Sequence, residues 1–330
     1  MKILNSTPTP TTPTKTPPTT KREPPAPSAP LDDALFEVDR EIQRWDGPLV
    51  AAFDVQRKTL ETATDLHRAD GEQTSGTKPI HFLEDADGDA FVLKVAPPAL
   101  VAAEIFADRL RTLAGRPSCP VVAKTIELDG ETLSGALKPR LDVDFGRHLP
   151  IDTQQWSALQ RAVVLRDHPW DWLLLNIDTH LEQYVLTGEE DVPLNVDWDR
   201  AMFQPTEGRR RLDRFEEHRL FTRSPLKNHL YDDYIGRRID LDLSLLTREA
   251  ARIDALPNED VAPLVRDLLA ALEPDDRPPR FLMQFLARKH TLVDDFDRFA
   301  DRLDAERERP QSTVDVRAAY QRMKSRLLTR

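Results

Sequence analysis

The sequence is poor in cysteine, with Cys119 as its one thiol among 330 residues. A single cysteine excludes an internal disulfide framework and any zinc site built from several cysteines, and beside Pro120 it is expected to be buried. No apolar run approaches the ~18 residues that a membrane-spanning helix requires. Ile3 and Leu4 are followed at once by polar residues and proline, unlike the apolar region of a secretory signal. We therefore expect a cytoplasmic chain without integral membrane contact.

Positive charge is also in deficit, since 46 Lys and Arg stand against 57 Asp and Glu and give a formal net charge of −11. Nucleic-acid binding draws its affinity from an excess of Lys and Arg, so no nucleic-acid partner is expected. Residues 1–30 are mostly Thr, Pro, Ser, Lys and Ala. Such a composition buries too little apolar surface to offset the entropy of ordering, and it predicts a disordered tail.

Hydrophobic periodicity predicts the secondary structure that follows this tail. The first half should contain a short helix, a β-hairpin around an acidic turn, an amphipathic helix stopped by a glycine, and two further strands. These elements are expected at 35–45, 80–95, 99–113, 121–128 and 132–137. The second half is mainly helical in period, with helices expected near 153–166, 169–176, 243–255, 259–272, 278–288, 291–305 and 313–327. Strands followed by helices indicate an α+β fold with a sheet-rich lobe over 31–140 and a larger helical lobe over 141–330.

Lys94 stands in the middle of an apolar strand, where a buried cation would be costly without a partner. Glu104 follows ten residues later in the amphipathic helix. A strand lysine held by a helix glutamate is the arrangement with which kinases bind the α- and β-phosphates of ATP. The pair is therefore a candidate phosphate site.

Two further polar clusters interrupt apolar segments in the second half. Polar residues concentrated between apolar flanks over 173–186 indicate a loop at the edge of a core. Asp197 and Asp199 follow a short apolar strand, and carboxylates at a strand end suit metal ligation. The polar residues of the first cluster are Asn176, Asp178, His180 and Gln183.

These motifs together resemble the atypical kinase superfamily, which includes the phosphoinositide 3- and 4-kinases, the HipA toxin kinases and the actin-fragmin kinases. The family's catalytic loop D-x-H-x-x-N is matched by residues 178–183 except at its last position, and Asn176 matches the HipA-like variant. The helix pattern E-x-x-A-x-x-L, followed by a glycine and a proline, is matched by 104–117. Asp197 matches the metal-binding Asp at the end of a short strand.

The resemblance implies a two-lobed protein-kinase-like fold and an ATP-dependent phosphotransferase that uses ATP and Mg²⁺. Lys94 would neutralise the α- and β-phosphates, Glu104 would orient Lys94, and Asp178 would accept the proton of the substrate hydroxyl. The resemblance assigns nucleotide binding to Ser75, Gly76, Lys94 and His180, with His180 packing within the loop, and metal binding to Gln183 and Asp197. Asp199 lies two residues from Asp197, and we expect it as a compensating second carboxylate for the metal.

Gln183 departs from the family, which has a metal-binding Asn at this position. Mg²⁺ tolerates little deviation from octahedral geometry, so two alternatives stay open. The chain is either an active kinase that phosphorylates a protein or a soluble small molecule, or a pseudokinase that serves as a nucleotide-binding interaction module. A third alternative is a metal-dependent phosphohydrolase with ligands from Asp178, His180, Asp197 and Asp199.

Overall fold

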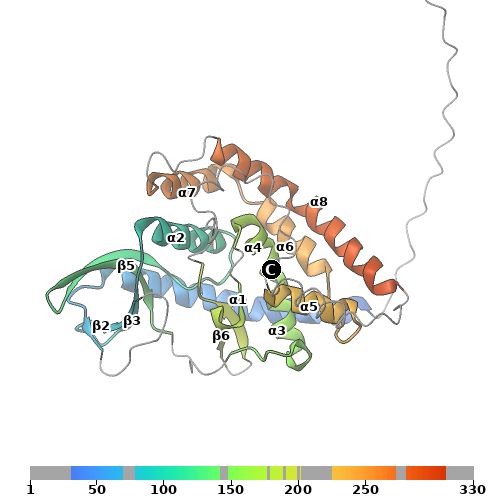
Figure 1. The fold of residues 1–330 in the computed structure, drawn as a ribbon, viewed down its shortest axis with the longest axis horizontal. Coiled ribbons are helices and arrows are strands. Elements are labelled where there is room, and N and C mark those ends of the chain that lie inside the picture. Colours follow the sequence, from blue (N-terminus) through green and yellow to red (C-terminus); the bar gives the residue numbers. More distant parts are fainter. Residues whose placement is uncertain are drawn as a thin grey trace, which may run out of the picture.

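A computed structural model describes most of the body of the chain. Figure 1 shows a curled sheet at one end, a group of helices at the other, and helix α1 running along both. The described residues are 31–69, 79–141, 148–176, 179–188, 191–198, 201, 225–272 and 280–309.

Five antiparallel strands form the sheet, in the order β1-β2-β3-β5-β4. β2 and β3 are the predicted hairpin. In its turn, one carboxylate oxygen of Asp85 accepts hydrogen bonds from the backbone N–H groups of Asp87 at 3.1 Å and Asp89 at 2.9 Å, a local bond typical of acidic turn residues. The strands are β1 (His67–Arg68), β2 (Ile80–Glu84), β3 (Ala90–Val95), β4 (Val122–Leu128) and β5 (Glu131–Pro139).

The two faces of β3 have different neighbours. Phe91 and Leu93 are buried in a core shared with Leu137 of β5 and Leu60 of α1. Lys94 lies on the opposite face, because successive side chains of a strand alternate. The apolar face therefore anchors the strand, and the other face is available for polar contacts.

Helix α2 (Pro98–Leu113) follows β3 and leads into β4. Pro98 opens it, which suits the first turn of a helix because no partner is needed there for a backbone N–H. Gly115 lies just beyond its end with φ +67, a left-handed conformation that glycine adopts without strain. The predicted helix over 99–113 is confirmed.

Helix α1 (Leu31–Thr62) has 32 residues and is much longer than the helix predicted over 35–45. Pro48 lies inside it, where proline removes one backbone hydrogen bond. The helix continues because its later half is anchored by packing: Phe53 lies against the β6–β7 hairpin and Leu60 lies in the sheet core. α1 also contacts β4, β5 and helix α3.

Among its described residues, the second part of the chain is mainly helical and contains one hairpin. β6 and β7 form this hairpin, with Val185 opposite Leu194. The described elements of the second part are η1 (Thr153–Gln155), α3 (Ala158–Arg166), α4 (His168–Leu174), η2 (Leu181–Gln183), β6 (Tyr184–Thr187), β7 (Val192–Asn195), α5 (Pro225–Ile235), α6 (Ser244–Asp254), α7 (Asn258–Ala270) and α8 (Phe281–Glu308).

The predicted α+β class, with a sheet-rich part before a larger helical part, is confirmed. Two of the helices differ from the sequence-based prediction. Helix α8 joins the two helices predicted over 278–288 and 291–305, and α5 was not predicted. The helix predicted over 313–327 and the tail predicted over 1–30 lie outside the described residues, and the lobe boundary at 140 remains a prediction.

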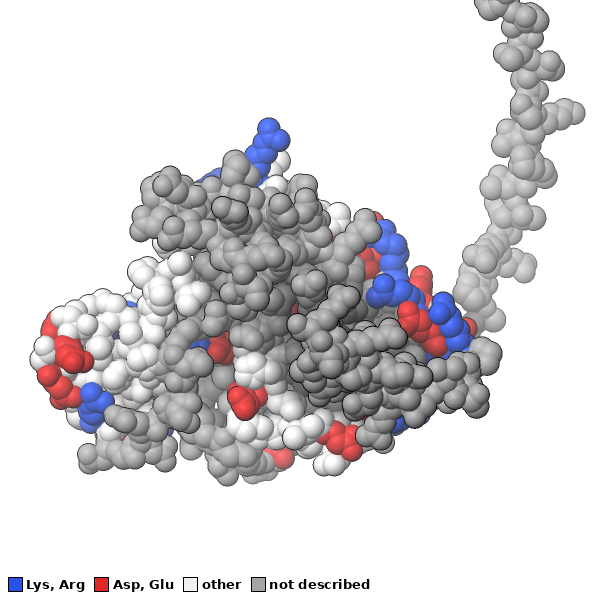
Figure 2. Space-filling model, viewed as in Figure 1, with Lys and Arg blue, Asp and Glu red and all other residues white. Residues whose placement is uncertain are grey.

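On the face shown in Figure 2, basic and acidic residues are scattered among the described residues. These residues form no extended basic patch on this face. Within the described part of the chain, no helix has the length and apolar character needed to cross a lipid bilayer.

Candidate active site

Lys94 and Asp197 meet between the sheet and the second part of the chain, although 103 positions separate them in the sequence. The Lys94 Nζ atom lies 2.8 Å from both carboxylate oxygens of Asp197. The Lys94 side chain is 12% exposed and that of Asp197 is 30% exposed. The pair is therefore open enough to exchange partners with a ligand.

Glu104 of α2 is buried and forms an ion pair with Lys138 of β5. The Lys138 Nζ atom also donates a hydrogen bond of 2.7 Å to the carbonyl of Val196, the residue before Asp197. The backbone N–H of Trp198 lies 3.5 Å from the same Glu104 carboxylate. The sequence predicted that Glu104 would orient Lys94, but its bonds in the structure come from Lys138 and Trp198.

Strand pairing explains why two lysines reach one place. Val92 pairs with Lys138 and Lys94 pairs with Ala136 across β3 and β5. Paired residues of antiparallel strands project to the same face, so the two lysines are diagonal neighbours on the face away from the apolar core. Sequence reasoning missed Lys138, because its place beside Lys94 depends on the pairing of β3 with β5.

The four charged groups influence one another. Burial raises the pKa of Glu104 and the carboxylate of Asp197 raises it further, while Lys138 and Lys94 oppose the shift. Burial lowers the pKa of Lys138, but the charges of Glu104 and Asp197 outweigh burial and raise it above its usual value. Lys138 is therefore a permanent cation of this cluster.

Backbone hydrogen bonds place the turn before the hairpin beside Asp197. The Gln183 carbonyl accepts a bond of 2.9 Å from the N–H of Val196, and the Asn195 side-chain oxygen accepts one of 3.1 Å from the N–H of Asp197. The Gln183 side-chain oxygen accepts a bond of 3.3 Å from the N–H of His180. Gln183 is thus next to the site, and its side-chain oxygen bonds to the backbone of the turn over 180–183.

Asp171 of α4 organises the polar residues just before this turn. Its carboxylate accepts hydrogen bonds from the amide of Asn176 at 3.2 Å and from the hydroxyl of Thr179 at 3.0 Å, and it forms a buried ion pair with Lys227 of α5. The two ends of the segment that contains Asp178 are therefore fixed to one carboxylate.

Another buried ion pair joins Arg111 of α2 to Asp167 before α4. The Tyr184 hydroxyl donates a hydrogen bond of 3.1 Å to the same carboxylate. The Arg111 guanidinium also stacks on the ring of Trp198 at 4.8 Å. This contact supports the residue that follows Asp197.

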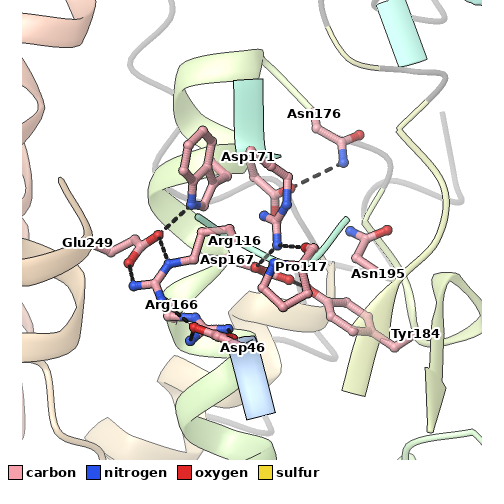
Figure 3. Close-up of polar contacts among 12 residues, drawn as sticks. Asp46, Arg116, Pro117, Arg166, Asp167, Asp171, Asn176, Tyr184, Asn195 and Glu249 are labelled. Atoms are coloured by element: carbon pink, nitrogen blue, oxygen red, sulfur yellow. Dashed lines mark hydrogen bonds and ion pairs between the residues drawn. The ribbon is translucent and has the colours of Figure 1, made fainter. Parts of the chain in front are cut away.

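A network of charges connects α1, the segment after α2, α3 and α6 (Figure 3). Arg116 forms ion pairs with Glu249 and with Asp46. Arg166 donates two hydrogen bonds to Asp46, at 2.7 and 3.0 Å. The Trp170 indole N–H donates a bond of 2.7 Å to Glu249. The network holds α2, and with it Glu104, against the helical part.

A cavity of about 520 Å³ lies on another face of α2 and not at the Lys94–Asp197 pair. Ala102, Ile105 and Arg109 line it together with residues of β4, β5 and α7. Their spacing of three and four residues marks one stripe of the helix, turned away from Glu104.

The structure brings together Lys94, Glu104 and Asp197, and it places Gln183 and His180 in the adjoining turn. The His180 side chain is 45% exposed, and its ring lies 4.0 Å from Glu182. No group of three His, Cys, Asp or Glu side chains poised to hold a metal occurs within the described ranges. The predicted residues outside those ranges are Ser75, Gly76, Asp178 and Asp199.

No protein-family model matches the sequence, and no curated protein matches it. Among solved structures, the fold is similar to the Helicobacter pylori proinflammatory kinase CtkA, with a TM-score of 0.48, 12% identity, and coverage of 73% of this chain and 98% of that chain. It is also similar to the Golgi casein kinase, with a TM-score of 0.43, 14% identity, and coverage of 79% and 76%. That kinase has also been solved with Mn/ADP bound.

A third similar structure is HipA of a toxin–antitoxin system of Shewanella oneidensis MR-1, with a TM-score of 0.37, 14% identity, and coverage of 78% and 72%. All the identities lie below 25% and all the TM-scores below 0.5. These similarities concern the arrangement of the chain, and we base the functional proposal on its own residues.

Proposed function

We propose that this chain is a kinase that transfers the γ-phosphoryl group of ATP to a hydroxyl of a protein or soluble small molecule. The contact of Lys94 with both carboxylate oxygens of Asp197 is the observation that carries the proposal. It joins a lysine of strand β3 to a carboxylate that follows strand β7 in the sequence. In kinases such a lysine binds phosphate and such a carboxylate binds the metal.

The order of elements supports the same function. A strand lysine, a helix with a buried glutamate, a polar turn, a short hairpin and an acidic residue follow one another along the chain. Lys94 would bind the phosphates and Asp197 would hold the metal, while Glu104 contributes through Lys138. The role of Asp178 as acceptor of the substrate proton remains a prediction from the sequence.

Mg²⁺ prefers carboxylate and amide oxygens, and the Asp197 carboxylate fits this preference. It is partly exposed and is held by an amine that a bound nucleotide would attract. Gln183 fits less well, because its amide oxygen is engaged by the N–H of His180. A bound Mg²⁺ would neutralise phosphate charge; Asp197 would hold it, and Lys94 would turn from Asp197 to the phosphates.

The engagement of Gln183 favours a second candidate, a nucleotide-binding module without phosphoryl transfer. Such a protein would keep Lys94 and Asp197 but lack the second metal ligand of the catalytic turn. The variant Gln183→Asn separates the candidates, because it should raise transfer in a weak enzyme and leave a pure binding module inactive.

Calorimetric titration of the full chain with ATP, in the presence and absence of Mg²⁺, tests the proposal. We expect saturable binding that Mg²⁺ strengthens and that Asp197→Asn weakens. Incubation with radiolabelled ATP, alone and with candidate acceptors, then tests transfer. Absence of ATP binding would refute both candidates, whereas binding without transfer would favour the module.

A further inference from the structure

Lys138 occupies a position where the polar face of the sheet, helix α2 and the segment before Asp197 meet. Its ammonium group pairs with Glu104 and donates a hydrogen bond of 2.7 Å to the Val196 carbonyl. The first contact lies in the sheet-rich part and the second in the segment after β7. A single amine therefore connects the two sides of the site.

We propose that Lys138 is a positioning residue of the nucleotide site, which neutralises Glu104 so that Lys94 remains available for phosphate. This inference rests on the proposed function. The sequence analysis had Lys94 both bind the phosphates and pair with Glu104. The proposal leaves phosphate binding to Lys94 and gives the pairing with Glu104 to Lys138.

The difference in burial shows which ion pair would open for a ligand. The Glu104 side chain is 3% exposed and Lys138 is 11% exposed, whereas Asp197 is 30% exposed. Separating a buried pair leaves uncompensated charge in a poorly solvated place, so the Lys138–Glu104 pair should persist. The Lys94–Asp197 pair can separate, with Asp197 turning to a metal and Lys94 to phosphate oxygens.

Removing Lys138 would leave Glu104 buried without its principal partner. The charge of Lys94 also acts on Glu104. We expect Glu104 to attract Lys94 and so to compete with the phosphates. Affinity for ATP should fall, while affinity for adenosine, which has no phosphate, should change much less.

The test compares ATP and adenosine affinities by calorimetry for wild type, Lys138→Met, Glu104→Gln and the double variant. Lys138→Met should weaken ATP binding by at least about tenfold relative to adenosine. In the Glu104→Gln background the same substitution should change ATP affinity by less than about threefold, because the carboxylate through which Lys138 acts is absent. Lys124→Met is the matched control, since Lys124 lies on β4 and donates a 2.6 Å bond to the Ala63 carbonyl.

Equal losses of ATP and adenosine affinity in Lys138→Met would overturn the proposal, because they would indicate general damage to the fold. If Lys138→Met does not fold, the comparison of Glu104→Gln with the double variant decides, and a loss of ATP affinity of about tenfold or more between them also contradicts it. Failure of the wild type to bind ATP would instead refute the proposed function itself.

Discussion

Arg111 Nη2 lies 2.9 Å from Asp167 Oδ1, and both side chains are almost fully buried. The pair joins α2 to the residue before α4, and Arg111 also stacks on Trp198, the residue after Asp197. Although burial opposes it, the charge of Arg111 lowers the pKa of Asp167 below its usual range. The carboxylate is therefore ionised at neutral pH and depends on the guanidinium.

Arg111→Met should destabilise the fold by about 3–5 kcal/mol, because it leaves a buried charge without its partner. Urea denaturation at neutral pH measures the change. Arg109→Met is the matched control on the same helix, since the exposed Arg109 lies 3.7 Å from Asp267 and should contribute less than about 1 kcal/mol. Similar losses for both variants would show that the buried pair has no special role.

Glu249→Gln should remove part of the stability that is lost in acid. Burial raises the pKa of Glu249, but the hydrogen bonds and charge of Arg116 outweigh burial and lower it below 4.5. A depressed carboxyl pKa stabilises the fold above the unfolded value, and that stability is lost as pH falls through the folded value. The difference in unfolding free energy between wild type and variant should therefore shrink on acidification below about pH 4.5.

Glu61→Gln serves as the control for this experiment, because Glu61 is exposed near the end of α1. Its unfolding free energy should follow that of the wild type throughout the same pH range. A constant difference between Glu249→Gln and wild type would contradict the assignment.

Asp108 should contribute to stability with the opposite pH dependence to Glu249, and the variant Asp108→Asn tests this. Burial raises the pKa of Asp108 to about 6, even though Arg57 lowers it. A raised carboxyl pKa means that the folded state retains a proton that the unfolded state releases. Stability is thus present below about pH 4 and lost as pH rises to about 6. Over this range wild type should lose about 3 kcal/mol relative to Asp108→Asn.

Asp54→Asn is the matched control, because Asp54 is an exposed partner of the same Arg57 at 2.9 Å. Removing it should cost less than about 1 kcal/mol, with little dependence on pH. A constant difference in unfolding free energy between wild type and Asp108→Asn over this pH range would contradict the raised pKa of Asp108.

Lys94→Met should abolish tight ATP binding while changing stability by only about 1 kcal/mol, because its partner Asp197 is partly exposed. Phosphoryl transfer, if observed in the wild type, should fall by about 10²–10³. Lys58→Met, at an exposed position of α1, should change neither quantity. A variant that binds ATP like the wild type would remove Lys94 from the site.

Cys119 should resist thiol reagents in the folded protein. It is buried, and burial raises the pKa of its thiol to about 12, so almost no thiolate exists at neutral pH. Labelling with a chromogenic disulfide should be slow in buffer and fast in urea. Rapid labelling of the native protein would show that the surrounding segment opens readily.

Local sequence patterns were sufficient for most of the sheet and for α2. The alternation in β3 and the glycine after α2 act over a few residues, so their effects can be predicted from the sequence. The length of α1 could not be predicted, because Pro48 suggests a stop and the packing of Phe53 that outweighs it involves residues more than a hundred positions away. Lys138 was missed for the same reason, since its meeting with Glu104 depends on strand pairing.

The long contact of α1 with β4, β5 and α3 has a mechanical consequence. A helix bound at once to the sheet and to the helical part resists their separation along its own side. A movement of the sheet that draws Lys94 away from Asp197 would therefore have to displace or bend α1 as well.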